Sequence, residues 1–257
     1  MTGVLPSQAL RRLIDQGGLS AQPAIQDDQI QPASLDLRLG TVAYRVRASF
    51  LAGHGRTVAD RIAEFEMHRV DLTQGAVLEK GCVYVIPLME RLALPHGLTA
   101  VANAKSSTGR LDLLTRTITD GGVEFDRIAP GYVGPLYAEV CPRSFSVLVR
   151  PGMRLNQIRF RDGQSVLNDA ELAALHAVDP LVSGAAVISE GLGFSVDLRP
   201  CEGDLLGFRA KPHTGVIDLA KIGHYPARDF WEDVRSSEGR IILDPGAFYI
   251  LVSREAV

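Results

Sequence analysis

The stretch SLDLRL, residues 34–39, alternates polar and apolar side chains and is followed by Gly40. Such a period of two is typical of a β-strand with one buried face. Further apolar runs occupy residues 83–88, 98–102, 136–140, 146–149 and 155–160. Glycine and proline turn signals separate these runs at residues 80–81, 95–97, 130–131 and 151–152. Short strands with frequent turns predict a mainly β protein, either a barrel or a sandwich.

The opening stretch has a second copy further along the chain, SVDLR at residues 195–199. A second pair of segments, LEKGCVY (78–84) and LDPGAFY (243–249), follows in the same order and at nearly the same spacing. Two matches in register predict a tandem duplication. The second copy has no counterpart of residues 100–160, so we expect either a truncated chain or a partner that covers the strand edges left open.

Helices are expected at three places only. Ser7 is placed to cap a helix over residues 8–16, and Asn168 to cap another over residues 169–177. Ser107 is placed to cap a short helical turn, whereas the polar residues 21–31 are predicted to form a loop. The predicted organisation is a first domain (1–162), a connector (163–190) and an incomplete second copy (191–257).

Composition excludes several classes of protein. The net charge of −3 offers no basic field for nucleic acid, and no apolar run is long enough to span a membrane. Residues 1–12 lack the features of a signal peptide. The three cysteines, Cys82, Cys141 and Cys201, are odd in number and far apart, which fits reduced thiols. We therefore expect a cytoplasmic protein without a nucleic-acid or membrane partner.

The segment KSSTGR, residues 105–110 and hereafter the hydroxyl block, carries two cations, adjacent hydroxyls and a glycine. Serine hydroxyls, backbone N–H groups and an arginine fork suit phosphate oxygens. The segment is not a Walker loop, because the required glycine and lysine spacing is absent. A capped turn with solvated charges is the alternative interpretation.

Glu139 is the first candidate for proton transfer. In the strand at residues 136–140 it shares a face with Tyr137 and points away from its apolar neighbours. A carboxylate in a pocket can relay protons to and from a water molecule. The alternative for Glu139 is an exposed glutamate on the strand. Gln157, in the segment PGMRLNQI (151–158), is a second candidate site residue, and its alternative is an ordinary surface residue.

Together these segments resemble the dCTP deaminase/dUTPase family over residues 30–160, and more weakly in the second copy. The resemblance is carried by IQPASLDLRLG (30–40), SSTGR (106–110), IAPGYVG (128–134), Glu139, and RPGM (150–153) running on to Gln157. The duplicated layout is similar to that of the long, two-copy bacterial dCTP deaminases. The resemblance implies a distorted β-barrel of the dUTPase-like, β-clip type, with sites where copies or subunits meet.

The resemblance also assigns roles to residues. It makes Glu139 the group that activates water for attack at cytosine C4, and it places Tyr132 under the deoxyribose. Mg²⁺ is expected on the triphosphate, with Asp36 either orienting the hydrated ion or bracing its strand. The implied substrate-binding set is Lys105, Ser106, Ser107, Arg110, Arg127, Tyr132 and Gln157.

Three functional hypotheses follow from these assignments. The first is deamination of dCTP to dUTP and ammonia by a homo-oligomer, with dTTP as an inhibitor. The second is dUTP hydrolysis, alone or with deamination; Ala129 stands where dUTPases carry an aspartate, although Asp126 lies three residues earlier. The third is a nucleotide-binding or assembly module without turnover.

Zinc is not expected in the reaction. Zinc-dependent deaminases use a His/Cys-x-Glu sequence with Pro-Cys-x-x-Cys, and neither the Cys-x-x-Cys spacing nor a histidine cluster occurs here.

The loop at residues 119–125 is longer than in the short deaminases that the chain resembles, and it adds Glu124 as a second carboxylate near the expected site.

Overall fold

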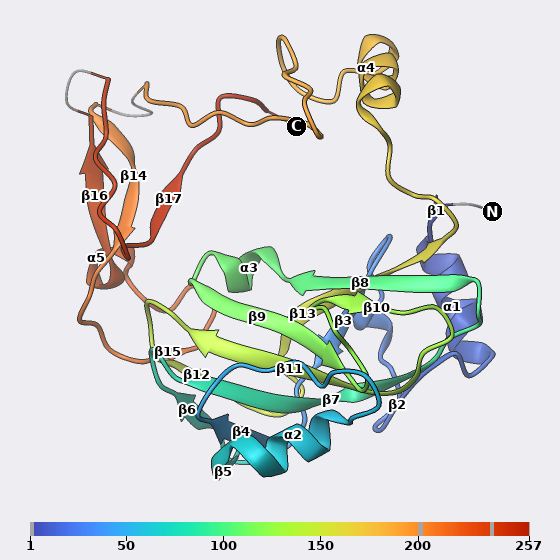
Figure 1. Ribbon diagram of the computed structural model, residues 1–257. Helices are drawn as coiled ribbons and strands as arrows, with labels where there is room; N and C mark the ends of the chain where they lie inside the picture. The colour runs from blue at the N-terminus through green and yellow to red at the C-terminus, as the bar shows by residue number, and fades with distance from the viewer. Residues whose placement is uncertain (1–2, 200–202, 237–238, 257) are drawn as a thin grey trace. The chain divides into compact units, whose positions relative to one another are not determined.

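The computed structural model describes residues 3–199, 203–236 and 239–256 (Figure 1). Two compact units divide the chain between them. The first unit contains Met1–Ser165 and Gly215–Tyr225, and the second contains Val166–Thr214 and Pro226–Val257. Cys201 and Val257 lie outside the described residues. Residues 215–225 therefore belong to the first unit although they follow much of the second in sequence.

The first unit contains two main antiparallel sheets and one small sheet. The first sheet has the order β1 (Gly3–Val4), β13 (Arg154–Asp162), β8 (Leu98–Ala104) and β10 (Arg127–Ile128), with β3 (Leu35–Arg38) also paired to β13. The second has the order β5 (Glu66–Asp71), β4 (Val42–Val46), β7 (Val83–Ala93), β11 (Val133–Pro142) and β9 (Leu113–Thr119), with β2 (Leu19–Ala21) on β7. The small sheet joins β15 (Ile217–Asp218), β12 (Val147–Val149) and β6 (Ala76–Leu78).

The mainly β prediction is confirmed, but a closed barrel is not observed. Within the described ranges, none of the sheets closes on itself. The two main sheets instead pack against each other, and the Asn156 amide on β13 donates to the Thr117 hydroxyl on β9 at 3.2 Å. A barrel would need one continuous hydrogen-bonded ladder, whereas the structure has separate ladders joined by side-chain contacts and by isolated backbone contacts such as the Leu39–Leu88 bridge.

Helices are short and few. They are α1 (Ser7–Asp15), the 3₁₀ turn η1 (Asp27–Gln29), α2 (Val58–Phe65), α3 (Ser106–Gly109), α4 (Asp169–Val178) and α5 (Ala227–Phe230). Asn168 caps α4 by accepting the Glu171 N–H, as predicted, but the cap of α1 is Pro6, which has no side-chain acceptor, and not Ser7. The predicted 21–31 loop contains η1. None of the described helices is long and apolar enough to cross a membrane.

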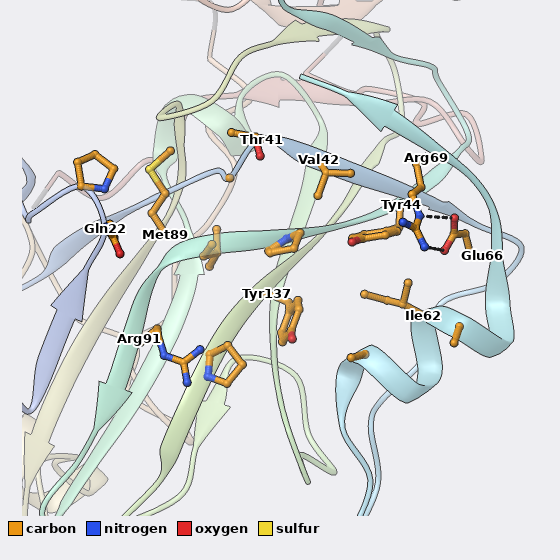
Figure 2. A pocket seen from close by; sticks show the side chains of 17 residues that line it. Gln22, Thr41, Val42, Tyr44, Ile62, Glu66, Arg69, Met89, Arg91 and Tyr137 are labelled. Atoms are coloured by element: carbon orange, nitrogen blue, oxygen red, sulfur yellow. Dashed lines mark hydrogen bonds and ion pairs between the residues drawn. The ribbon is translucent and has the colours of Figure 1, made fainter. Parts of the chain in front are cut away.

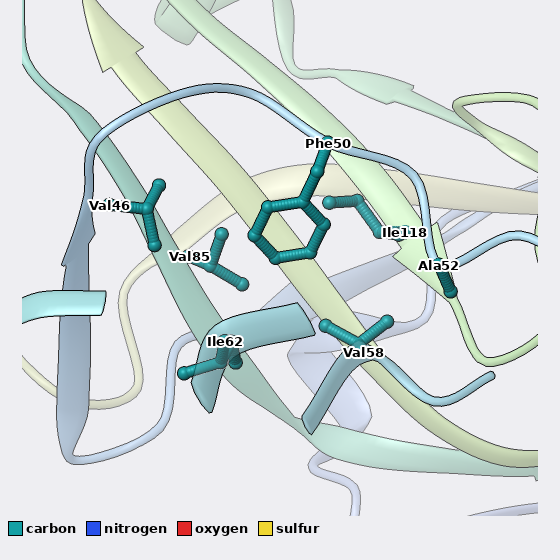
Figure 3. Packing of buried hydrophobic residues seen from close by; sticks show 7 residues of the cluster. All are labelled: Val46, Phe50, Ala52, Val58, Ile62, Val85 and Ile118. Atoms are coloured by element: carbon teal, nitrogen blue, oxygen red, sulfur yellow. The ribbon is translucent and has the colours of Figure 1, made fainter. Parts of the chain in front are cut away.

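A hydrophobic cluster fills the space between α2, the preceding loop and the second sheet (Figure 3). Val58 and Ile62 on α2 are buried against Val85 on β7, because these apolar side chains project from one helix face. Phe50 stacks at 5.4 Å against Phe65, the last residue of α2. This cluster covers the sheet face that carries Glu139.

The SLDLRL stretch forms the predicted strand, but its burial differs from the prediction. All four residues of β3 are buried, including Asp36 and Arg38, so the strand has no exposed polar face. Arg38 is neutralised by Glu90 at 2.8 Å and donates further to the carbonyls of Pro23 and Ala24. Buried charges are tolerated only when they are paired in this way.

The second unit contains one antiparallel sheet in the order β16 (Trp231–Arg235), β14 (Leu205–Ala210) and β17 (Tyr249–Leu251). Helix α5 leads directly into β16. The SVDLR copy forms no extended strand here; Val196 makes only an isolated bridge with Ser253.

Candidate functional site

Glu139 lies in the middle of β11, directly opposite Arg116 on β9. Its side chain is only 1% exposed, so the exposed-strand interpretation is wrong. The Nε atom of Arg116 donates to Oε1 at 3.1 Å, and Nη2 of the same guanidinium also contacts Oε1. The other carboxylate oxygen, Oε2, is buried and has no hydrogen-bond partner within the described residues. One oxygen is therefore fixed while the other is left to accept a proton.

Arg116 is held from its other side as well. Its guanidinium carbon lies 3.7 Å from the centroid of the Phe125 ring, and Nη2 donates to the Ser49 hydroxyl at 3.0 Å. A cation stacked on an aromatic face is restrained in orientation. Arg116 was not predicted, since nothing in the local sequence pattern indicates which β9 residue lies opposite Glu139.

Asp126 lies on the neighbouring segment, three residues before Ala129, and was not among the predicted site residues. Its Oδ1 accepts the Thr117 N–H at 2.7 Å, and its φ of 63° lies in the left-handed region. Burial raises the pKa of Asp126, although the hydrogen bond from Thr117 and the Arg116 charge oppose that rise. Glu139 is close enough to raise it further, so the two carboxylates are electrostatically coupled.

The hydroxyl block forms α3 and the residues beside it. Lys105 is the N-cap, and α3 has no side-chain cap, so the predicted capping by Ser107 is wrong. Ser106, Ser107 and Arg110 are exposed. The Lys105 ammonium is bonded to the buried carboxylate of Asp36, which leaves the hydroxyls and Arg110 facing solvent.

Gln157 lies on β13, with Asp36 on β3 on one side and Asn103 on β8 on the other. It is half-buried, and its Oε1 accepts the Ser34 hydroxyl at 3.0 Å. Oδ1 of Asp36 has no partner in the part of the chain that the structure describes. Lys105, Asp36 and Gln157 therefore come together across the first sheet.

Arg127 and Tyr132 line a separate cleft of about 480 Å³ beside the 119–125 loop. Arg127 is exposed and paired with Glu124 at 2.8 Å, away from Glu139. The Tyr132 hydroxyl donates to the Pro135 carbonyl at 2.6 Å and accepts the Asp120 N–H at 3.2 Å. Through these two hydrogen bonds the Tyr132 phenol holds the 119–125 loop in place.

Tyr132→Phe tests this bracing. Burial is the main cause that raises the pKa of Tyr132 to about 12 from 10.0, so the neutral phenol stabilises the fold fully below pH 10. That contribution is lost as the pH rises through about 12. We expect the variant to lose about 1 kcal/mol of unfolding free energy at pH 8. Its stability should then fall less steeply than wild type between pH 10 and 12 in urea denaturation, and parallel profiles would contradict this.

The predicted residues thus form three separate groups, namely Glu139 with Arg116, the hydroxyl block with Asp36 and Gln157, and Arg127 with Tyr132. Within the described residues, no hydrogen bond or ion pair joins one of these groups to another. Nor do three His, Cys, Asp or Glu side chains gather as a metal site in those ranges.

A larger cavity of about 700 Å³ contains none of the predicted residues (Figure 2). It lies between α2 and the strands β4, β7 and β11, and Tyr44, Ile62 and Tyr137 line it. Figure 2 shows the Arg69–Glu66 ion pair at one end of this cavity and Arg91 at the other. The lining of this cavity contains both polar and apolar side chains, but no run of adjacent hydroxyls and cations comparable to the hydroxyl block.

The family model of the 2′-deoxycytidine 5′-triphosphate deaminase N-terminal domain matches residues 1–164. The chain belongs to the dCTP deaminase family. The model of the C-terminal domain of dCTP deaminase matches residues 168–257. Both compact units therefore fall within regions described for this family.

Solved and curated members of the dCTP deaminase family are similar to the chain. A crystal structure of 2′-deoxycytidine 5′-triphosphate deaminase from Agrobacterium tumefaciens is 52% identical, with a TM-score of 0.95, and the match covers 100% of this chain and 78% of that one. The dCTP deaminase of Natronomonas pharaonis is 29% identical over 63% of this chain and 82% of its own. A protein of Coprothermobacter proteolyticus named "dCTP deaminase, dUMP-forming" is 29% identical over 61% of this chain and 81% of its own.

Proposed function

We propose that the protein deaminates dCTP hydrolytically to dUTP and ammonia. The observation that carries the proposal is the Glu139 carboxylate, which is buried, fixed by Arg116 through one oxygen and unpartnered at the other. Oε2 takes a proton from water as the water oxygen adds to C4 of cytosine. The same oxygen then returns the proton to the amino group, which leaves as ammonia, while the remaining proton of the added hydroxyl moves to N3 and the C4 carbonyl forms.

The binding roles implied by the family resemblance remain part of the proposal. Ser106, Ser107 and Arg110 hold phosphate oxygens, and their exposure leaves these donors accessible to a ligand. Tyr132 and Arg127 line the cleft where the nucleoside is proposed to bind. The separation of these groups within one chain supports sites completed between copies in a homo-oligomer.

Mg²⁺ is proposed to enter with the triphosphate, whose charge it would neutralise. Asp36 does not fit as its ligand, because the carboxylate is buried and its charge is already paired with Lys105. Bracing of the strand is therefore the role that we propose for Asp36. Since Mg²⁺ usually keeps several waters and binds phosphate oxygens, no further protein ligand is required.

Incubation of the purified protein with dCTP and Mg²⁺ tests the proposed reaction. We expect ammonia and dUTP in equal amounts, without pyrophosphate, resolved by anion-exchange chromatography and an ammonia assay. Bound dCTP without any product would instead indicate a nucleotide-binding module. Inhibition by added dTTP would be measured in the same assay.

A deaminase that goes on to hydrolyse dUTP is the second candidate, because several relatives carry the name "dCTP deaminase, dUMP-forming". Ala129 cannot act as a base, but Asp126 is half-buried, and burial together with the Glu139 charge raises its pKa. Pyrophosphate and dUMP in the dCTP assay would favour this candidate.

We also propose that the second unit repeats part of the first. The sheet order β16-β14-β17 has the same form as β5-β4-β7, with a helix leading into the outer strand in each case. Arg209 lies 5.8 Å from the Tyr249 ring, and Arg45 lies 5.8 Å from the Tyr84 ring. These equivalent contacts support a tandem duplication.

The turns before the two tyrosines support the same proposal. The Glu79 N–H donates to the Tyr84 hydroxyl at 3.1 Å, and the Asp244 N–H donates to the Tyr249 hydroxyl at 3.1 Å. Gly81 and Gly246 both have φ of 78°.

The domain boundaries 1–162, 163–190 and 191–257 stay predictions. A cytoplasmic location is likewise proposed, and the unpaired thiols of Cys82 and Cys141 support it.

A further inference from the structure

Residues 215–225 form a strap from the C-terminal family region that folds onto the first unit. Strand β15 of this strap runs parallel to β12. The Ile217 N–H donates to the Ser146 carbonyl at 3.0 Å, and the Leu219 N–H donates to the Leu148 carbonyl at 3.2 Å. Backbone pairing therefore fixes where the strap lies.

Asp218 anchors the strap to the first unit. Arg150 donates to both oxygens of its carboxylate, at 2.6 and 3.1 Å. The Ala220 N–H donates to Oδ1 at 3.0 Å, and the Lys221 N–H donates to the Asp218 carbonyl at 3.0 Å. These hydrogen bonds close a turn over residues 218–221. The turn fixes the position of the Lys221 backbone relative to the first unit.

The strap and the hydroxyl block line one cavity of about 340 Å³. Lys105 and Ser107 come from the block, Arg154 comes from β13, and Lys221 comes from the strap. A volume of this size is within the range of small-molecule sites. Three cations and two hydroxyl side chains, those of Ser107 and Thr108, line the cavity and favour an anionic ligand.

Two of these cations are already committed to carboxylates. The Lys105 ammonium is bonded to Asp36, and the Arg154 guanidinium is bonded to Asp28 at 2.8 Å. Asp218, the acid that also lines the cavity, has both oxygens on Arg150. Lys221 is exposed and makes no ion pair within the described residues. Its ammonium is the uncommitted positive charge of the cavity.

We propose that Lys221 binds the phosphate groups of the nucleotide held by the hydroxyl block. The inference rests on the proposed function for the identity of the ligand, but the site itself is an oligophosphate site. Ser107 belongs to the N-terminal family region and Lys221 to the C-terminal family region, and both line the cavity. The C-terminal region thereby takes part in substrate binding at the hydroxyl block.

Titration calorimetry of the full chain with inorganic tripolyphosphate tests the proposal without requiring turnover. Loss of a charge-assisted hydrogen bond predicts a Kd about 10-fold higher for Lys221→Ala than for wild type. Lys221→Arg should stay close to wild type because it keeps the charge. Arg12→Ala removes an exposed cation on α1, outside the cavity, and should leave the Kd unchanged.

The result that overturns the proposal is a Kd for Lys221→Ala within twofold of wild type, or a wild-type protein that does not bind tripolyphosphate. Ammonia release from dCTP by wild type is measured in parallel. If Lys221→Ala binds as wild type does while wild type releases ammonia, the role of Lys221 fails and the deaminase stands. If tripolyphosphate affinity falls in the variant but wild type releases no ammonia, the oligophosphate site stands and the deaminase fails.

Discussion

Glu139→Gln is expected to reduce ammonia release from dCTP by about 100- to 10,000-fold, the range that a positioned general acid–base contributes. Glutamine keeps the size of the side chain and can still accept the Arg116 hydrogen bond through its amide oxygen. Its amide nitrogen, however, cannot take a proton from water. We therefore expect kcat to fall while the Kd for dCTP stays within a few-fold of wild type.

Two further variants separate this role from its alternatives. Glu64→Gln removes an exposed carboxylate on α2, outside the candidate site, and should leave kcat unchanged. Glu124→Gln tests the second carboxylate that the sequence placed near the site. Undiminished turnover in Glu139→Gln, together with lost turnover in Glu124→Gln, would transfer the proton-relay role to Glu124.

The strands that sequence analysis located correctly are those whose signal is local. Strands β7, β8, β11, β12 and β13 are apolar runs bounded by Gly or Pro turns, and each is present. By contrast, β4, α2 and β5 were not predicted. Strand β5 is exposed over much of its length and α2 has only eight residues, so neither carries a long hydrophobic period.

The site was predictable in its residues but not in its pairings. Glu139 was selected from its position in the strand, yet its contact with Arg116 depends on the register between β11 and β9, which no local pattern fixes. Lys221 was missed for a similar reason, because only the fold brings the strap beside the hydroxyl block. Sequence spacing can indicate the residue types of a site, whereas tertiary pairing decides their partners.

Arg38 and Glu90 illustrate the same limit, and they give the prediction with the largest effect on stability. The alternation in SLDLRL predicted an exposed Arg38, but Glu90 is far away in sequence and its buried carboxylate turns the arginine inward. Glu90 accepts from the Arg38 Nε at 2.8 Å, the Arg38 N–H at 2.8 Å and the Gln29 amide at 2.9 Å. The carboxylate thus joins β3, β7 and η1 in one network.

Glu90→Ala is expected to lower the unfolding free energy by about 3–5 kcal/mol, because it leaves the buried Arg38 guanidinium without a counter-charge. Urea denaturation at pH 7 measures the loss, and a melting temperature lower by roughly 10 °C should accompany it. Glu64→Ala, which breaks only exposed ion pairs, should cost less than about 1 kcal/mol. Equal losses in the two variants would contradict a structural role for the Glu90 network.

Replacing both partners distinguishes a lost charge from a lost network. In Arg38→Met/Glu90→Leu no charge is left unpaired, so the double variant should be more stable than Glu90→Ala. It should not reach wild-type stability, because the carbonyls of Pro23 and Ala24 and the Gln29 amide would each lose a hydrogen bond. A double variant no more stable than Glu90→Ala would mean that packing and hydrogen bonds, rather than the unpaired charge, account for the loss.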